Sequence, residues 1–259
     1  MSKSGFNFMV NYIRKYKSDI PEELRNKCMI NEDGLTLATY WIKIMEKEIN
    51  NMIKHGSFDE CVPKWMRHDP EIKDKHGWTI AYHWVTIFNC DVPKWMRHEP
   101  NLQNSKGKTI GMIYLMNSNT NKRDFPDWMQ CDVSIFDEFG NSILDYWLEF
   151  NDLDIPEWMG IDKHFVNGNG ETVEMSWLIH RKRVPPNKWR QCHEDEHDII
   201  KYDKNIKTKT GFTYKDIYRI IFPDMSDSDF EEEYGDSLYS LENNDNEEEE
   251  DLSMYVLHD

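Results

Sequence analysis

Short apolar runs recur along the chain, each behind the same polar signal. The signal is a glycine, any residue, and then Thr or Ser, as in Gly77–Thr79. Glycine permits a turn with positive φ, and the hydroxyl that follows can cap a helix that begins immediately after it. The pattern therefore predicts a short helix at each of these runs: Leu37–Ile42, Ile80–Val85, Ile110–Leu115, Ile143–Leu148 and Met175–Ile179.

An Asp or Asn usually stands just before the glycine. Side chains of this kind hydrogen-bond to nearby backbone groups and favour turns. We therefore expect these residues to belong to the turns: Asp33, Asp74, Asn104, Asp137 and Asn169.

A second marker, Pro-x-Trp-Met, lies between the apolar runs. It begins at Pro63, Pro93, Pro126 and Pro156, at intervals of 30 to 33 residues. Weaker copies are Pro186–Trp189 and Ile20–Leu24. Proline is tolerated in the first turn of a helix, so the marker predicts the start of a second helix, with Trp and Met pointing inward. A unit this short cannot bury its own Trp, and neighbouring units must stack.

The two ends of the repeats also carry helical patterns. Residues 1–19 hold apolar side chains at helical spacing, which predicts an amphipathic capping helix. Thr213–Phe222 is expected to be the last helix, because Thr213 can cap it and Pro223 ends it.

The segment Arg67–Thr79, RHDPEIKDKHGWT, resembles the hairpin turn of the ankyrin repeat, and Arg97–Leu102 begins the same phrase. Thr79–Tyr82 departs from that family's Thr-Pro-Leu-His, and Trp-Met replaces its Leu-Leu. The resemblance implies an all-α fold, an ankyrin-like helical repeat solenoid, and the charge distribution adds an acidic C-terminal tail. Another class of helical repeat is the alternative. The expected divisions are 1–19 for the capping helix, 20–222 for the repeats and 223–259 for the tail.

Charge is concentrated at the C-terminal end. The chain has a formal net charge of −17, and no Lys or Arg follows Arg219. An acidic block of this kind is commonly disordered, but Phe230, Tyr234, Leu238 and Leu241 could form an apolar stripe that fixes it as a row of carboxylates. We expect that row to bind a partner through Asp224, Asp227, Asp229, Glu231, Glu232, Glu233, Asp236, Glu242, Asp245, Glu247, Glu248, Glu249, Glu250 and Asp251.

Other features limit where the protein acts. No apolar stretch approaches the ~18 residues of a membrane span, and the N-terminus does not look like a signal peptide. The five cysteines are scattered, without a Cys-x-x-Cys pair, and are expected to be reduced thiols. We therefore expect a cytoplasmic protein, in the host cytoplasm if the source is a phage.

One segment could carry chemistry. His193–His197 matches His-Glu-x-x-His, the zinc-protease pattern, and Cys192 could complete a Cys-His-His metal site. No third zinc ligand stands at a set distance, and a polar segment between repeats is the simpler interpretation. His68 and His98 occupy equivalent repeat positions, which favours a structural hydrogen bond. The basic cluster at Arg181–Arg183 favours a solvated face or pairing with acids. We expect no enzyme activity, no cofactor and no bound metal.

Repeat solenoids offer long surfaces for protein binding. An ordered acidic row can replace DNA in a basic channel, since DNA carries about one negative charge per 1.7 Å of its axis. In type, the chain resembles an acidic antirestriction protein of a tailed bacteriophage. That resemblance implies inhibition of a DNA-handling enzyme, a type I restriction-modification complex above all. The alternatives are an ankyrin-type adaptor for a host protein and, third, a metal-dependent hydrolase at His193 and His197.

Overall fold

The computed structural model describes residues 3–25, 30–56, 58–117, 125–161, 165–183, 185 and 206–226. These residues form eight α-helices and several 3-10 helices, and their only β-pairing is two isolated bridges, Ile30 with Thr36 and Val166 with Thr172. The described part of the chain is therefore all-α, as predicted. Within the same ranges, no helix combines the length and the apolar character that crossing a bilayer requires.

The chain divides into two compact units, Met1–Ser176 (unit 1) and Trp177–Asp259 (unit 2), and the division falls inside α7. The helices, with η for the 3-10 type, follow in this order: α1 (Lys3–Tyr16), η1 (Glu22–Leu24), α2 (Leu37–Ile44), α3 (Glu46–Lys54), η2 (Phe58–Glu60), η3 (Lys64–Met66), α4 (Ile80–Phe88), η4 (Lys94–Met96), α5 (Ile110–Met116), η5 (Asp127–Met129), α6 (Ile143–Phe150), η6 (Glu157–Met159), α7 (Val173–Arg181) and α9 (Tyr214–Ile221).

The predicted helices begin where the polar signal places them. The hydroxyl of Thr36 accepts a hydrogen bond from the Thr39 backbone N–H at the start of α2, and Thr109 caps α5 in the same way. Ser142 and Thr213 each form a capping box with an Asp three residues later. These side chains satisfy backbone donors that the first helical turn leaves without partners.

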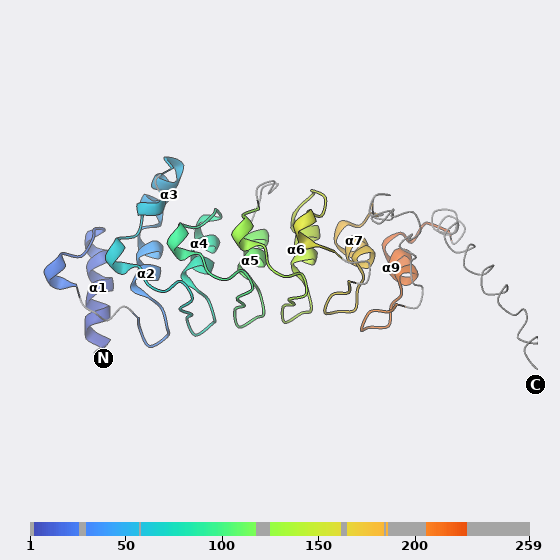
Figure 1. Ribbon diagram of the computed structural model, residues 1–259, viewed down its shortest axis with the longest axis horizontal. Coiled ribbons are helices and arrows are strands. Elements are labelled where there is room, and N and C mark those ends of the chain that lie inside the picture. The colour runs from blue at the N-terminus through green and yellow to red at the C-terminus, as the bar shows by residue number, and fades with distance from the viewer. Residues whose placement is uncertain are drawn as a thin grey trace, which may run out of the picture. The chain divides into compact units, whose positions relative to one another are not determined.

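In unit 1 the helices lie side by side in chain order. α1 packs against α2, α2 against α4, α4 against α5, and α5 against α6 (Figure 1). The helix expected within residues 1–19 is α1, and it buries Phe6, Met9, Val10 and Ile13. The core is therefore shared between successive helices.

A tryptophan in each of α2, α4 and α6 ties that helix to a loop later in the chain. Trp41, Trp84 and Trp147 each stand five residues after the helix cap. Their indole Nε1 atoms donate to backbone carbonyls of the following loop, at 2.7 Å to Cys61, 3.1 Å to Asp91 and 3.0 Å to Asp154. The loop is thereby held against the helix that precedes it.

The predicted second helix of each unit is wrong in its extent. The Pro-x-Trp-Met segments form only single 3-10 turns of three residues, η3, η4, η5 and η6. After η3 and η4 the chain becomes extended at Arg67 and Arg97. Each turn has one fully buried side chain, the methionine, and that single anchor does not support a longer amphipathic helix.

The tryptophans of these turns are half-buried rather than inside the core. Three of them lie beneath an arginine of the preceding unit. Their distances from the guanidinium carbon to the ring centre are 4.8 Å for Arg25 and Trp65, 5.5 Å for Arg67 and Trp95, and 5.5 Å for Arg97 and Trp128. These cation–π contacts join successive units at their edges.

Among the described residues of the next units, the helix α3 has no counterpart, and it was not predicted. It packs against α2 and η2. Its residues account for the longer interval between Pro21 and Pro63 than between later prolines. The insertion leaves the following turn, η3, in the same form as η4.

Candidate protein-binding surface

The glycine-containing turns of unit 1 share one hydrogen-bond pattern, and together we name them the hairpin row. They span residues 31–34, 74–77, 104–107, 137–140 and 167–170, hairpins 1 to 5. In hairpin 2, Oδ1 of Asp74 accepts from the backbone N–H of His76 at 2.8 Å and of Trp78 at 2.9 Å. The first residue of each hairpin plays this part, so the polar side chain builds the turn from within.

The sequence pattern identified this residue correctly at Asp74, Asn104 and Asp137 but not in hairpins 1 and 5. There the residues that close the turn are Asn31 and Asn167, not Asp33 and Asn169. The closing residue stands three positions before the glycine, whereas Asp33 and Asn169 stand directly before it. Their side chains therefore lie at the tip of the turn, where both residues are half-buried.

Successive hairpins are joined through the backbone. The N–H of Lys75 donates to the Asp33 carbonyl at 2.8 Å, and that of Ser105 to the His76 carbonyl at 3.1 Å. The N–H of Glu138 donates to the carbonyl of Lys106 at 2.9 Å. Hairpins 1 to 4 are therefore held at fixed spacing, and Figure 1 shows the turns of unit 1 projecting together from the row of helices.

The tips of the row differ in chemistry. Hairpin 2 presents Lys75 and His76, hairpin 3 Ser105 and Lys106, and hairpin 4 Glu138 and Phe139, all exposed. The Phe139 side chain is 63% exposed, an unusual position for a large apolar group. A fixed backbone thus displays basic, polar, acidic and aromatic side chains in sequence.

Behind the tips of hairpins 2 and 4, the closing residue contacts a helix side chain nine positions later. Oδ2 of Asp74 lies 3.1 Å from Nε2 of His83, and Oδ2 of Asp137 accepts from the Tyr146 hydroxyl at 2.6 Å. Burial, the largest influence, lowers the pKa of His83 to about 4. Burial and the Asp137 carboxylate raise the pKa of Tyr146. Both helix residues are therefore neutral near pH 7.

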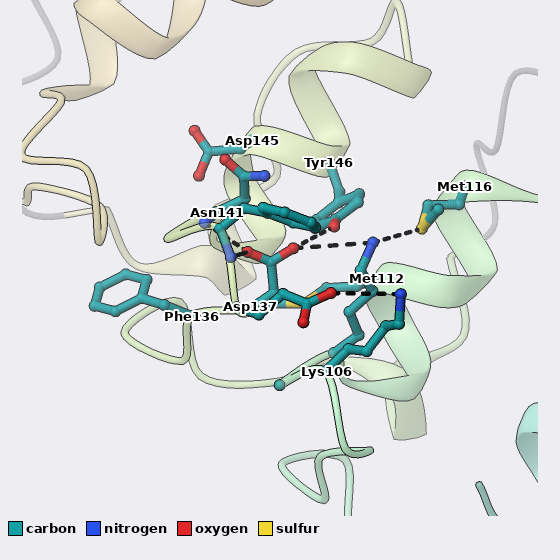
Figure 2. A network of polar contacts seen from close by, with 12 residues as sticks. Lys106, Met112, Met116, Phe136, Asp137, Asn141, Asp145 and Tyr146 are labelled. Atoms are coloured by element: carbon teal, nitrogen blue, oxygen red, sulfur yellow. Dashed lines mark hydrogen bonds and ion pairs between the residues drawn. The ribbon is translucent and has the colours of Figure 1, made fainter. Parts of the chain in front are cut away.

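Figure 2 shows the Asp137 network in detail. Nζ of Lys108 lies 3.9 Å from Oδ2 of Asp137, 4.9 Å from the centre of the Tyr146 ring, and 3.4 Å from the Met116 sulfur. Nζ of Lys106 lies 3.5 Å from a Glu138 carboxylate oxygen at the tip. The buried contacts of Asp137 with Lys108 and Tyr146 join hairpin 4 to the chain just after hairpin 3, whereas the Lys106–Glu138 pair is exposed.

An open pocket of about 290 Å³ lies between hairpins 2 and 3. Its lining comprises Asp74, His76, Trp78, His83, Ser105 and Lys106. The Trp78 ring is tilted against the rings of His83, at 5.4 Å between centres, and of Tyr82, at 6.1 Å. Sequence reasoning missed Trp78 and His83. Two positions in the sequence could have pointed to them. Trp78 stands one residue before the cap Thr79, and His83 stands nine residues after the closing residue Asp74.

The histidine prediction is confirmed for His68. Its Nε2 lies 2.9 Å from Oγ1 of Thr36, the cap of α2, and its Nδ1 lies 2.7 Å from the Asp69 carbonyl. His98 repeats the second contact, at 2.8 Å from the Glu99 carbonyl. Both imidazole rings therefore contact the backbone of the segment that leads to the next hairpin.

Most of the acidic residues predicted to bind a partner, from Asp227 to Asp251, lie outside the described residues. Asp224 is described, and it is exposed in the turn after α9. The Cys192, His193 and His197 candidates also lie outside them. In the basic cluster, the Arg181 guanidinium lies 5.2 Å from the centre of the Trp177 ring. Within the described ranges, no group of three His, Cys, Asp or Glu residues could hold a metal ion.

The sequence matches no model of a known protein family and no curated protein.

Proposed function

We propose that this chain is an ankyrin-like helical repeat solenoid that binds another protein through its hairpin row. The observation that carries this proposal is the set of backbone hydrogen bonds between successive hairpins. They hold the tips at fixed spacing without using tip side chains. The exposed Lys75, His76, Lys106 and Phe139 are then available to a partner, and little ordering entropy opposes binding because the backbone is already fixed.

Site-specific photocrosslinking tests this proposal. Benzoylphenylalanine replaces Phe139 at a hairpin tip or, as the control, Glu157, an exposed residue of η6. In extracts of the source cells, we expect one defined protein to crosslink to the Phe139 position and not to the Glu157 position. Equal crosslinking from the two positions, or none from Phe139, would contradict binding through the row.

A second candidate function follows from the charge distribution. The formal net charge is −17, and every charged side chain after Arg219, histidine apart, is an acid. This supports the inhibitor expected from the sequence, in which carboxylates, Asp224 among them, occupy the DNA-binding surface of a type I restriction-modification complex. The partner would then be a basic protein surface rather than nucleic acid.

DNA cleavage by a type I restriction enzyme, with the protein titrated in, tests this candidate. We expect inhibition that excess DNA relieves and that salt weakens, because many charge pairs carry the binding. A full-length variant with the acids of 242–251 changed to amides should lose potency. Full potency in that variant would exclude the acidic segment as the inhibitory element.

A further inference from the structure

The pocket between hairpins 2 and 3 has a preformed apolar floor. The Trp78 indole is held against His83 and Tyr82, is half-buried, and lines the pocket. Trp78 directly follows the glycine of hairpin 2. The residues that follow the glycine of hairpins 1, 3 and 4 are Leu35, Lys108 and Asn141. A flat aromatic surface is therefore a local feature of this pocket and not a requirement of the repeat.

The one carboxylate in the pocket lining is already engaged. Asp74 has a side chain only 5% exposed, its Oδ1 accepts two backbone N–H groups, and its Oδ2 contacts His83. A cationic side chain entering the pocket would therefore find no free carboxylate to pair with. This argues against a lysine or arginine of a partner as the occupant.

The lysines near the floor differ in their partners. Lys75 pairs with Asp33 and Lys108 with Asp137, both acids of neighbouring hairpins, and neither lysine lines the pocket. Lys106 lies in the pocket lining with its side chain 62% exposed, and His76 lies beside it. The ion pair of Lys106 with Glu138 is exposed, and such pairs contribute little and exchange readily.

We propose that this pocket binds a glutamate side chain from an acidic segment of the partner protein. The methylene groups of the glutamate pack on the Trp78 indole, and its carboxylate lies between Lys106 and His76. This assignment rests on the proposed binding of a partner through the hairpin row. It adds that the partner carries an acidic segment and that hairpins 2 and 3 bind this segment.

The test uses the full chain labelled with ¹⁵N at its tryptophan indoles, and the Trp78 signal is identified by its loss in Trp78→Phe. Hexaglutamate and hexalysine are titrated separately at low salt. We expect hexaglutamate to shift the Trp78 indole signal in a saturable way, and hexalysine to leave it in place. A larger response to hexalysine, or no response to either peptide, overturns the proposal.

Two charge-reversal variants provide the matched comparison. Lys106→Glu changes the pocket, and Lys94→Glu makes the same change at an exposed position of η4. We expect Lys106→Glu to weaken hexaglutamate binding about fivefold, as the loss of one exposed charge pair allows, and Lys94→Glu to have a smaller effect. Equal weakening in the two variants would reduce the binding to general charge attraction and refute the pocket.

The outcomes separate this inference from the proposed function. Crosslinking that is specific for Phe139, together with a silent Trp78 signal, refutes the glutamate pocket alone. Loss of that specificity refutes the hairpin row as a binding surface, whatever hexaglutamate does at Trp78.

Discussion

The indole Nε1 of Trp128 donates a hydrogen bond to Oδ1 of Asp91 over 2.8 Å, across 37 positions of the chain. The same carboxylate pairs with Arg97 at 2.9 Å, and Arg97 in turn covers the Trp128 ring. Asp19, Arg25 and Trp65 repeat the arrangement one pair of units earlier. An Asp two residues before the proline thus joins its own unit to the next one.

Cys61 occupies the position of that Asp in the intervening unit, and Nε1 of Trp95 there is buried without a hydrogen-bond partner among the described residues. We predict that Cys61→Asp stabilises the protein by about 1 kcal/mol, because the new carboxylate can accept from Trp95 and pair with Arg67. Urea unfolding measures the change. In the double variant with Trp95→Phe most of the gain should vanish, and an equal gain there would contradict this explanation.

Removal of the existing carboxylate should have the opposite effect. Asp91→Ala leaves the Trp128 indole N–H and the Val92 backbone N–H without their acceptor, and Arg97 without its ion pair. We predict a loss of about 1–3 kcal/mol in the free energy of unfolding. Asp132→Ala is the control and should cost less, because that exposed carboxylate accepts hydrogen bonds from Ser134 of its own turn rather than joining two units.

Gly77 is required by two separate constraints. Its φ of +74° is unfavourable for other residues, and a Cβ there would lie 2.6 Å from the backbone nitrogen of Ser105 in the next hairpin. Gly56 has a similar φ of +75° but no atom within 4 Å of such a Cβ. We predict that Gly56→Ala costs about 1–2 kcal/mol from the backbone alone, and that Gly77→Ala costs about 1–3 kcal/mol more. Equal costs would mean that the hairpins do not pack as closely as the structure shows.

Stability should fall in acid because of His83. Burial lowers its pKa in the folded protein to about 4, below the usual 6.5. The folded state therefore binds fewer protons than the unfolded state, and the contribution is complete above pH 6.5 and is lost as the pH falls toward 4. Between pH 7 and pH 4.5 this amounts to about 2 kcal/mol.

The variant His83→Gln should show a correspondingly smaller loss of stability over that range, measured by urea unfolding at each pH. His76→Gln, at an exposed position of hairpin 2, just before α4, is the control. The pKa values of His68 and His98 are also lowered by burial, so part of the acid dependence should remain in both variants.

The helices could be predicted from the sequence because each needs only local information. A hydroxyl that caps the first turn and an apolar run after it specify α2, α5 and α6 within a few residues. The second helix of each unit could not be ruled out in the same way, because a proline at a helix start suits an α-helix and a 3-10 turn equally. The structure distinguishes the two forms, because each segment buries a single methionine, such as Met66 or Met96, and an α-helix would need more than one such anchor.

The candidate surface was predictable as a set of turns but not as a pocket. In hairpin 1, both Asn31 and Asp33 can accept backbone hydrogen bonds, and only the offset from Gly34 selects Asn31. The pocket combines Trp78 with Lys106, residues of different units. Their proximity depends on the contact between hairpins, which the local pattern does not contain.

The backbone hydrogen bonds between hairpins need no side chain, because every amino acid other than proline provides both the N–H donor and the carbonyl acceptor. A substitution at Lys75, His76, Ser105, Lys106 or Glu138 therefore leaves the donor and the acceptor of each bond in place. The side chains at the tips can therefore be mutated while the hydrogen-bonded backbone of the row is retained. A chain built in this way can change the molecule that it recognises through a few surface mutations, and an engineer can randomise these positions as a binding library without redesigning the core.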